Sequence, residues 1–338
     1  MLTLFTVPKQ FAGHVGVIQK NAIQSWARLG HGCQIILCAD ESGTRHLAEM
    51  VGAVHLSAVE RNEFGTPLLS SVFSEVARVA EQPLLCYLNA DIIVFPELLN
   101  AVRRVPWSEF LMIGRRTNVD IREPLNFGRP NWEQELRAWT QVNGQLAPSN
   151  GIDYMVFSRA SALRNLPPFA VGRPCWDNWF VDRALRCGLP VIDATSVVLA
   201  LHQNHGYGHV PKRRGRAWEG PEADANRSLV GGEARMATID DANFYFKGDR
   251  LRRNRHVRTW LKRRMRIALP GALRTVPGAL RTLPRLMKRW RQKMRIGAML
   301  CTRCPSLLWP FASGQLRSRP LRLIQAMRAP EKHGCVNC

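Results

Sequence analysis

Short runs of apolar residues alternate with amphipathic segments along residues 1–115. Residues 2–7, 33–39 and 84–88 are apolar over most of their length, whereas residues 14–29 place apolar side chains three and four positions apart. A strand that is apolar throughout is buried on both faces, which is typical of a parallel sheet covered by helices on each side. The pattern therefore predicts an α/β fold with a mostly parallel sheet.

The same alternation predicts the remaining elements. Further helices are expected over residues 44–51, 67–80, from residue 96, 132–142 and 177–187. Further strands are expected over residues 53–56, 110–114, 153–158, 190–192 and 197–201. The second half is less regular and is expected to build onto the same sheet as the outer wall of a cleft.

The positive charge of the chain is confined to its C-terminal part. Residues 247–338 hold 24 of the 48 Lys and Arg residues but only two acidic residues, so they carry the whole net charge of +22. We therefore expect one neutral α/β domain over residues 1–246 and a basic tail over residues 247–338. A seven-residue repeat with Pro at its second position, over residues 269–289, prevents one long helix in the tail.

Within the tail, residues 250–296 interleave Trp, Leu, Met and Ile with Lys and Arg. This composition suits contact with an anionic membrane surface. A partly disordered, solvated tail and a nonspecific nucleic-acid patch are the alternatives, and nucleic acid is the partner that the neutral domain favours least. Two CxxC pairs, residues 301–304 and 335–338, are either a zinc site or free thiols.

The sequence contains no pattern that predicts export or a membrane span. Residues 1–10 do not combine a basic segment with an apolar core and a cleavage site. No apolar run reaches the roughly 18 residues that a spanning helix needs. We therefore expect a cytoplasmic protein, and the tail extends this expectation to peripheral attachment at the inner face of the membrane.

Several expected strands end at polar residues. They are Thr6, which is followed by Pro8, at the first strand, Asp40 after the second, Asn89 and Asp91 after residues 84–88, and the pair Arg115 and Arg116 after the next, of which Arg115 is the candidate for the ligand. Ligands of open α/β sheets bind at the carboxyl ends of the strands, so these residues are expected at one edge. A carboxylate such as Asp91 suits Mn²⁺ or Mg²⁺, which would bridge it to a nucleotide diphosphate. In the alternative interpretation, Asp91 caps the helix that follows.

Four phrases in the chain carry a resemblance to a known family. Residues 62–68 (NEFGTPL), 87–93 (YLNADII), 176–179 (WDNW) and 202–205 (HQNH) resemble a largely uncharacterised bacterial family of GT-A-like glycosyltransferases. The similarity covers roughly residues 1–246. It implies a nucleotide-sugar donor, a divalent metal ion and transfer of the sugar to the hydroxyl of a glycan or lipid-linked acceptor.

The resemblance also implies roles for single residues. Asp91 would be the metal-binding Asp of a D-x-D-type triplet whose first acidic position is Asn89 here. Thr6, Pro8 and Asp40 match the strand ends that hold base and ribose in such enzymes, although ordinary turn residues are the alternative. A late histidine often completes the metal site, which points first to His202 and then to His205 or His209.

The phrase at residues 176–179 contributes a second group of candidates. The resemblance implies that Asp177, at the start of a helix, is the base that accepts the acceptor's proton, with Asp182 as a second candidate. Trp176 and Trp179 would offer aromatic faces to a sugar ring. In the alternative interpretation, Asp177 caps its helix between two tryptophans that pack in the core.

Two other functions stay open at this point. A catalytically degenerate binding module, brought by its tail to an anionic membrane or to nucleic acid, is favoured by Asn89 in place of an acid. A nucleotidyltransferase would share the fold and the cation. It is expected to carry a Gly-rich basic loop after the first strand, where this chain has one Lys and one Gly in residues 7–14.

Overall fold

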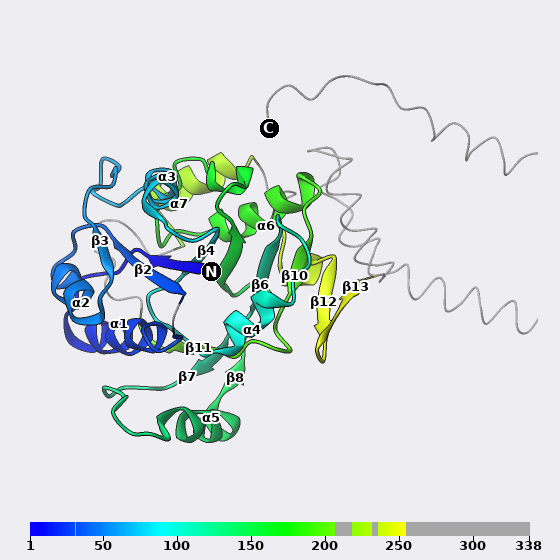
Figure 1. Cartoon of the computed structure of the whole chain (residues 1–338). Helices are drawn as coiled ribbons and strands as arrows, with labels where there is room; N and C mark the ends of the chain where they lie inside the picture. Colours follow the sequence, from blue (N-terminus) through cyan, green and yellow to red (C-terminus); the bar gives the residue numbers. More distant parts are fainter. Residues whose placement is uncertain (31, 207–217, 232–235, 255–338) are drawn as a thin grey trace, which may run out of the picture. The chain divides into compact units, whose positions relative to one another are not determined.

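The structure is a computed structural model that describes residues 1–30, 32–206, 218–231 and 236–254. Its centre is a nine-stranded sheet in the order β13-β12-β10-β6-β9-β4-β1-β2-β3 (Figure 1). These strands are β1 (Leu2–Thr6), β2 (Cys33–Cys38), β3 (Val54–Leu56), β4 (Leu84–Leu88), β6 (Leu111–Arg115), β9 (Ile152–Ser158), β10 (Val191–Asp193), β12 (Phe244–Lys247) and β13 (Arg250–Arg253).

Most neighbouring strands of this sheet are parallel, as the sequence predicted. β1 pairs in parallel with both β2 and β4, with Leu2 opposite Cys33 on one side and Leu84 on the other. β2 pairs in parallel with β3, and β10 pairs in parallel with β6 and β12. The carboxyl ends of β1, β2 and β4 therefore lie at the same edge.

One central strand runs against this direction. β9 lies between β4 and β6 and is antiparallel to both. All seven of its residues are buried. A strand buried on both faces has the same apolar pattern whichever way it runs, so the sequence pattern predicted this strand without its direction.

Helices cover both faces of the sheet. They are α1 (Gly13–Trp26), α2 (Thr44–Val51), α3 (Leu69–Val79), α4 (Glu97–Arg103), α5 (Trp132–Asn143), α6 (Trp176–Arg186) and α7 (Pro221–Val230). Side chains of β4 alternate between two cores: Cys86 and Leu88 pack in the one that holds α1, α2 and α4, whereas Leu85 and Tyr87 pack in the one that holds α3, α6 and α7. This alternation is that of a strand between two helical layers.

A second, smaller sheet begins directly after the Asn89–Asp91 turn. Its order is β5-β11-β7-β8. Its strands are β5 (Ile92–Val94), β7 (Thr117–Val119), β8 (Gln145–Leu146) and β11 (Ala200–Gln203). The sequence predicted only β11, and placed it a few residues early. Strands of two or three residues are too short to show a periodicity.

The sheet continues past the domain boundary expected at residue 246. That position lies inside β12, which pairs with β10 and with β13. The folded body therefore extends at least to Arg253. The seven-residue repeat, most of residues 250–296, His209 and both CxxC pairs lie outside the described residues. Within the described part of the chain, no helix is long and apolar enough to cross a membrane.

Candidate metal and nucleotide site

The turn between β4 and β5 places Asp91 at the carboxyl edge of the large sheet. The Ile92 N–H donates to the Asn89 carbonyl oxygen at 3.1 Å, which closes the turn. The carbonyl oxygen of Ile92 accepts from the indole N–H of the buried Trp26 in α1, at 2.8 Å. Asp91 is therefore held between a buried strand and a buried helix.

The pairing of β11 with β5 brings two histidines to this turn. The strands are antiparallel with His202 opposite Ile92, the residue that follows Asp91. The fully buried side chain of Gln203 fixes this arrangement: its amide N–H groups donate to the carbonyl oxygens of Ile18, at 2.8 Å, and of Asp91, at 3.1 Å. The position of His202 is thus set by sheet register.

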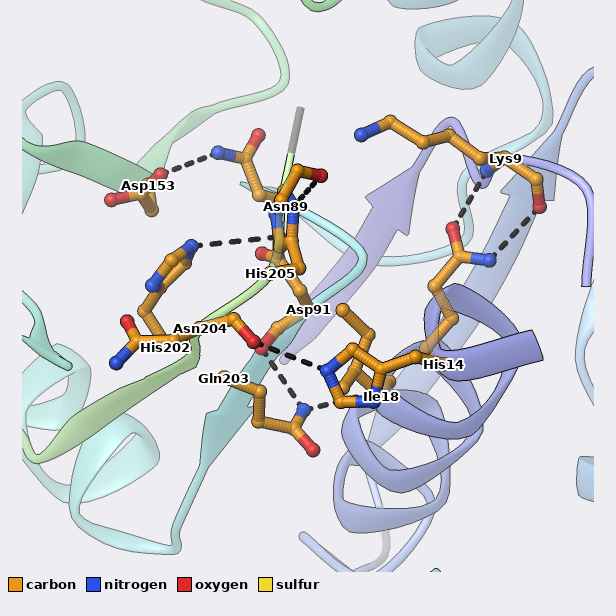
Figure 2. Close-up of polar contacts among 12 residues, drawn as sticks. Lys9, His14, Ile18, Asn89, Asp91, Asp153, His202, Gln203, Asn204 and His205 are labelled. Atoms are coloured by element: carbon orange, nitrogen blue, oxygen red, sulfur yellow. Dashed lines mark hydrogen bonds and ion pairs between the residues drawn. The ribbon is translucent and has the colours of Figure 1, made fainter. Parts of the chain in front are cut away.

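Asp91, His202 and His205 form a compact cluster (Figure 2). Nε2 of His205 lies 2.8 Å from Oδ2 of Asp91, and Nε2 of His202 lies 3.7 Å from the same oxygen. One potential ligand atom from each residue lies within 4.8 Å of the others. The side chains of Asp91, His202 and His205 are only 14%, 10% and 7% exposed. The three sequence candidates for metal ligands are therefore brought together.

The charges of the cluster favour an ionised carboxylate. Burial alone would raise the pKa of Asp91, but the hydrogen bond from His205 and the nearby positive charges bring it down to about 2. The hydrogen bond to Asp91 raises the pKa of His205, whereas burial lowers that of His202. Asp91 is thus an anion facing one imidazole that favours protonation and one that favours the neutral form.

Two atoms of the cluster have no hydrogen-bond partner within the described part of the chain. They are Oδ1 of Asp91 and Nδ1 of His202, and both are buried. Leaving a buried polar atom without a partner costs about 1–3 kcal/mol, and a bound ion is one way to compensate that cost. Mg²⁺ prefers oxygen ligands, whereas imidazole nitrogens suit transition metals, so one carboxylate and two imidazoles are the donors of a divalent transition-metal site. The residues therefore fit a metal ion.

Asn89 does not join this cluster. Its side-chain N–H donates to Oδ1 of Asp153, a buried residue of β9, at 2.5 Å. Arg116 donates to the other oxygen of Asp153 at 2.6 Å. An acid at position 89 would face the Asp153 carboxylate without a proton to donate, so this contact accounts for the amide. In the fold the amide of Asn89 holds Asp153, and contact of Asn89 with a nucleotide stays a prediction.

The arginine that reaches the site is Arg116, whereas the sequence analysis favoured Arg115. Nε of Arg115 donates to the carbonyl oxygen of Ala147 at 2.5 Å, away from the cluster. Successive residues of an extended chain point to opposite sides, so only one of the two adjacent arginines can face Asp153. The pair itself was visible in the sequence, but its orientation was not.

Asp177 lies in the first turn of α6, where its Oδ1 accepts from the N–H of Asn178 at 2.9 Å. Burial raises the pKa of Asp177 to about 7; the negative charge of Asp153 adds to the rise, and Arg116 opposes it. Cys175, the residue just before helix α6, has a φ of 81°, a left-handed conformation that is strained for a residue with a side chain. Asp182 is buried on the same helix.

Trp176 belongs to the core, in contrast to the expected sugar-binding role. It is 6% exposed, and its ring lies edge-on to that of Tyr87 with centroids 4.9 Å apart. Trp179 packs edge-on against the buried Phe169 at 5.5 Å. Helix α6 begins at Trp176 and turns this ring into the core, whereas Trp179 is only half-buried and its role toward a sugar stays a prediction.

The residues expected to hold base and ribose share the edge with Asp91. Thr6 and Pro8 are buried after β1, and within the described residues Oγ1 of Thr6 has no hydrogen-bond partner. The side chain of Asp40 is 67% exposed and lies 3.8 Å from Nε2 of His55. With strands about 4.8 Å apart, the end of β2 lies about 10 Å from the end of β4. That distance leaves room for a ligand across both ends.

A cavity lined largely by polar residues opens beside the cluster. It has a volume of about 590 Å³ and is lined by His14, Asp120, Arg122, Asn204, His205 and Gly206. The side chain of Asn204 donates to Asp120 at 2.8 Å, and its carbonyl oxygen lies 3.2 Å from Nε2 of His14. Of these residues, only Asn204 and His205 belong to a phrase that the sequence singled out, residues 202–205, and only His205 was expected to bind a ligand.

Comparisons with known proteins give only distant structural similarity. No protein-family model matches the chain, and no curated protein matches its sequence. Glucosyl-3-phosphoglycerate synthase from Mycobacterium tuberculosis, solved with Mn²⁺, UDP-glucose and phosphoglyceric acid, is 14% identical over 68% of this chain and 79% of that one, with a TM-score of 0.40. Residues 1–349 of S. aureus TarS, solved with UDP-GlcNAc, are 12% identical over 71% and 70%, with a TM-score of 0.45. The function of this chain is therefore inferred from its own site.

Proposed function

We propose that the protein is a glycosyltransferase that moves a sugar from a nucleotide-diphosphate-sugar donor to an acceptor hydroxyl with the help of a divalent metal ion. The observation that carries this proposal is the Asp91–His202–His205 cluster at the carboxyl edge of a mostly parallel sheet. Ligands of such sheets bind at this edge, and the cluster adds the donors of a metal site.

In this proposal, Asp91, His202 and His205 hold Mn²⁺ or Mg²⁺, and their two nitrogen donors suit Mg²⁺ less well. When bound, the ion would neutralise charge on the diphosphate that leaves the sugar. Base and ribose would lie toward the ends of β1 and β2, near Thr6 and Asp40. This order along the edge follows from the neighbouring positions of β4, β1 and β2 in the sheet.

Asp177 is the proposed base. Its carboxylate would accept the proton of the acceptor hydroxyl while that oxygen bonds to the anomeric carbon. The bond from that carbon to the diphosphate oxygen would break with its electron pair on the diphosphate. A pKa of about 7 suits a base that works near neutral pH. Asp153 contributes indirectly, because its charge helps to keep this pKa high.

The acceptor would lie in the cavity beside His205. Its lining of imidazole, carboxylate, guanidinium and amide groups suits a compound rich in hydroxyls. A glycan or a lipid-linked sugar fits this description. Contact of residues 250–296 with an anionic membrane remains a separate proposal, because nearly all of that segment lies outside the described residues.

A screen of nucleotide sugars tests the proposed function directly. The full chain would be mixed with UDP-, GDP- and TDP-sugars, with Mn²⁺, with Mg²⁺ and with EDTA, and the unfolding temperature recorded. A donor that binds the folded state raises this temperature by mass action, and it should do so only with metal. If no donor raised it under any condition and none was consumed, the glycosyltransferase proposal would be overturned.

The alternative of a degenerate binding module loses its main support. That interpretation relied on Asn89 as the sign of a lost metal ligand. In the fold, Asn89 donates a hydrogen bond to Asp153, which an acid could not do. Its presence is therefore compatible with an intact site built from Asp91 and two histidines.

A further inference from the structure

Lys9 occupies a fixed position in the loop between β1 and α1. Its main-chain N–H donates to Oε1 of Gln19 at 2.7 Å, and Nε2 of Gln19 donates back to its carbonyl oxygen at 2.9 Å. Gln19 is itself buried in α1. The side-chain amide of Gln19 thus makes two hydrogen bonds with the main chain of Lys9 and fixes the position of this loop residue. The side chain of Lys9 takes no part in these two bonds.

The side chain of Lys9 extends from this loop toward Asn89 and Asp91 (Figure 2). Burial lowers the pKa of Lys9; the charge of Asp91 raises it, and the charge of Arg173 lowers it again. Asp91 and Arg173 are therefore the two charged residues that act most on this ammonium group. Within the described part of the chain it makes no hydrogen bond or ion pair. A partly buried ammonium without an anion is costly unless something else neutralises it.

Its cationic neighbour is neutralised differently. Arg173 donates from Nε to Oε2 of Glu222 at 3.0 Å and also contacts this oxygen through a terminal guanidinium nitrogen. Glu222, in the first turn of α7, is buried and accepts a further hydrogen bond from Asn62 at 2.8 Å. Arg173 therefore has a dedicated carboxylate, and Lys9 is left as the cation that still lacks one.

The charges at this edge point to an anionic ligand. Asp91 is the nearby anion, and it already contacts His205. A divalent ion at the cluster would add two positive charges next to Lys9. An edge with that much positive charge requires a ligand with several negative oxygens, and a diphosphate has this character.

We propose that Lys9 is a diphosphate-binding residue, whose ammonium group contacts the phosphate oxygens of a nucleoside diphosphate at the Asp91–His202–His205 cluster. This inference rests on the proposed function and adds a residue to it. The metal would hold the diphosphate from one side and Lys9 from the other. Both charges would stabilise the diphosphate as it leaves the sugar.

Binding measurements on the full chain test the role of Lys9 without catalysis. UDP, GDP, TDP and inorganic pyrophosphate would be titrated by calorimetry into wild type, Lys9→Met, Lys9→Arg and Lys20→Met, with Mn²⁺ and with EDTA. Lys20 is an exposed lysine of α1 and is the matched control. Removing one hydrogen bond to a charged group is expected to weaken diphosphate binding about 10- to 100-fold in Lys9→Met.

Three further readouts separate this role from a structural one. Affinity for Mn²⁺ alone should change less than about threefold in Lys9→Met, because Lys9 is not a ligand of the cluster. Lys9→Arg should recover part of the binding, and Lys20→Met should match wild type. The unfolding temperature should also stay close to that of wild type, because the contacts with Gln19 use main-chain atoms of Lys9.

The outcomes distinguish the two proposals. Equal binding of the diphosphates by wild type and Lys9→Met would overturn the role of Lys9 and leave the glycosyltransferase proposal intact. If wild type bound no nucleotide but bound pyrophosphate in a Lys9-dependent way, the proposed function would fail and the anion site would stand. If wild type bound neither, both proposals would be overturned.

Discussion

Asp91 and Asp153 are buried carboxylates near the same sheet edge, and their surroundings differ. Both oxygens of Asp153 receive a donor, one from Asn89 and one from Arg116. Only one oxygen of Asp91 does so, from His205, and within the described residues the other has no hydrogen-bond partner. Asp153 thus accepts a hydrogen bond on each oxygen, whereas Asp91 accepts one on Oδ2 alone among the described residues.

The difference indicates which carboxylate supports the site and which one is available to a ligand. A buried anion with a donor on each oxygen is compensated by the protein and holds the groups that donate to it in place. A buried anion with an open oxygen lacks that compensation until something binds. We therefore propose that Asp91 binds the ligand and that Asp153 supports the site.

The largest expected effect that separates the two carboxylates comes from Asp91→Asn. This change removes the only anionic ligand of the proposed metal site, so Mn²⁺ affinity should fall by more than about 100-fold and transfer activity should become undetectable. Asp153→Asn should lower Mn²⁺ affinity by about tenfold, since residues that act through a ligand matter less. Calorimetric titration of Mn²⁺ measures both. Equal losses in the two variants would contradict the distinction.

A second prediction concerns Asp177, whose pKa is raised in part by Asp153. Asp177→Asn should lower transfer activity by about 10²- to 10⁴-fold, because the amide cannot accept the acceptor's proton. Wild-type activity should rise with pH through about 7, where Asp177 loses its proton. The pH profile of the transfer rate measures this. A profile without a step near that pH would rule out Asp177 as the base.

The same residue affects stability in the opposite direction. Because folding raises this pKa above its ordinary value of 3.8, the contribution of Asp177 to stability is present below that value and is lost as the pH rises through about 7. Asp177→Asn should therefore gain about 1–3 kcal/mol over wild type as the pH is raised from about 5 to about 8. Urea unfolding at both pH values provides the check.

Arg116→Met tests the contacts of Asp153 and should act on stability. It leaves Asp153 buried with an unpaired charge, which should lower the free energy of unfolding by about 3–5 kcal/mol. Arg122→Met, at an exposed arginine, should change it by less than about 0.5 kcal/mol. A small effect of Arg116→Met in urea unfolding would mean that Asn89 alone suffices to hold Asp153.

The smallest expected effect is that of Asn89→Asp, which places an acid at the first position of a D-x-D-type triplet. It replaces a hydrogen-bond donor by a carboxylate facing the carboxylate of Asp153, so it should cost about 1–2 kcal/mol of stability. Affinity for Mn²⁺ should not improve, because this side chain points to Asp153. A tighter metal site in Asn89→Asp would show that position 89 belongs to the cluster.

The sequence predicted the parallel part of the fold well. Continuous apolar runs identified β1, β2 and β4, and the rule that ligands bind at strand ends led to Asp91. His202 and His205 came from a phrase that resembles a family, and the fold places both beside Asp91. Metal binding by these three residues stays a prediction that the titrations above would test.

The rest of the site could not be predicted because it depends on pairing between distant segments. Asp153 looked like an ordinary strand residue, since nothing local indicates that β9 runs antiparallel beside β4. Arg116 could not be separated from Arg115 without the direction of each side chain. Trp176 was assigned to a ligand because its sequence does not show which way its helix faces.

The register of β11 has a consequence for how the chain folds. His205 and Asp91 are 114 positions apart in the sequence, and they meet only when β11 has inserted between β5 and β7. Contacts of such separation form late, because a long loop must close first. An ion that binds only the completed cluster would stabilise that closure, by about 2.7 kcal/mol at 100 times its Kd. The metal would then link Asp91 to the two histidines, which are more than a hundred positions away in the sequence. Without the metal, local unfolding should begin at β11.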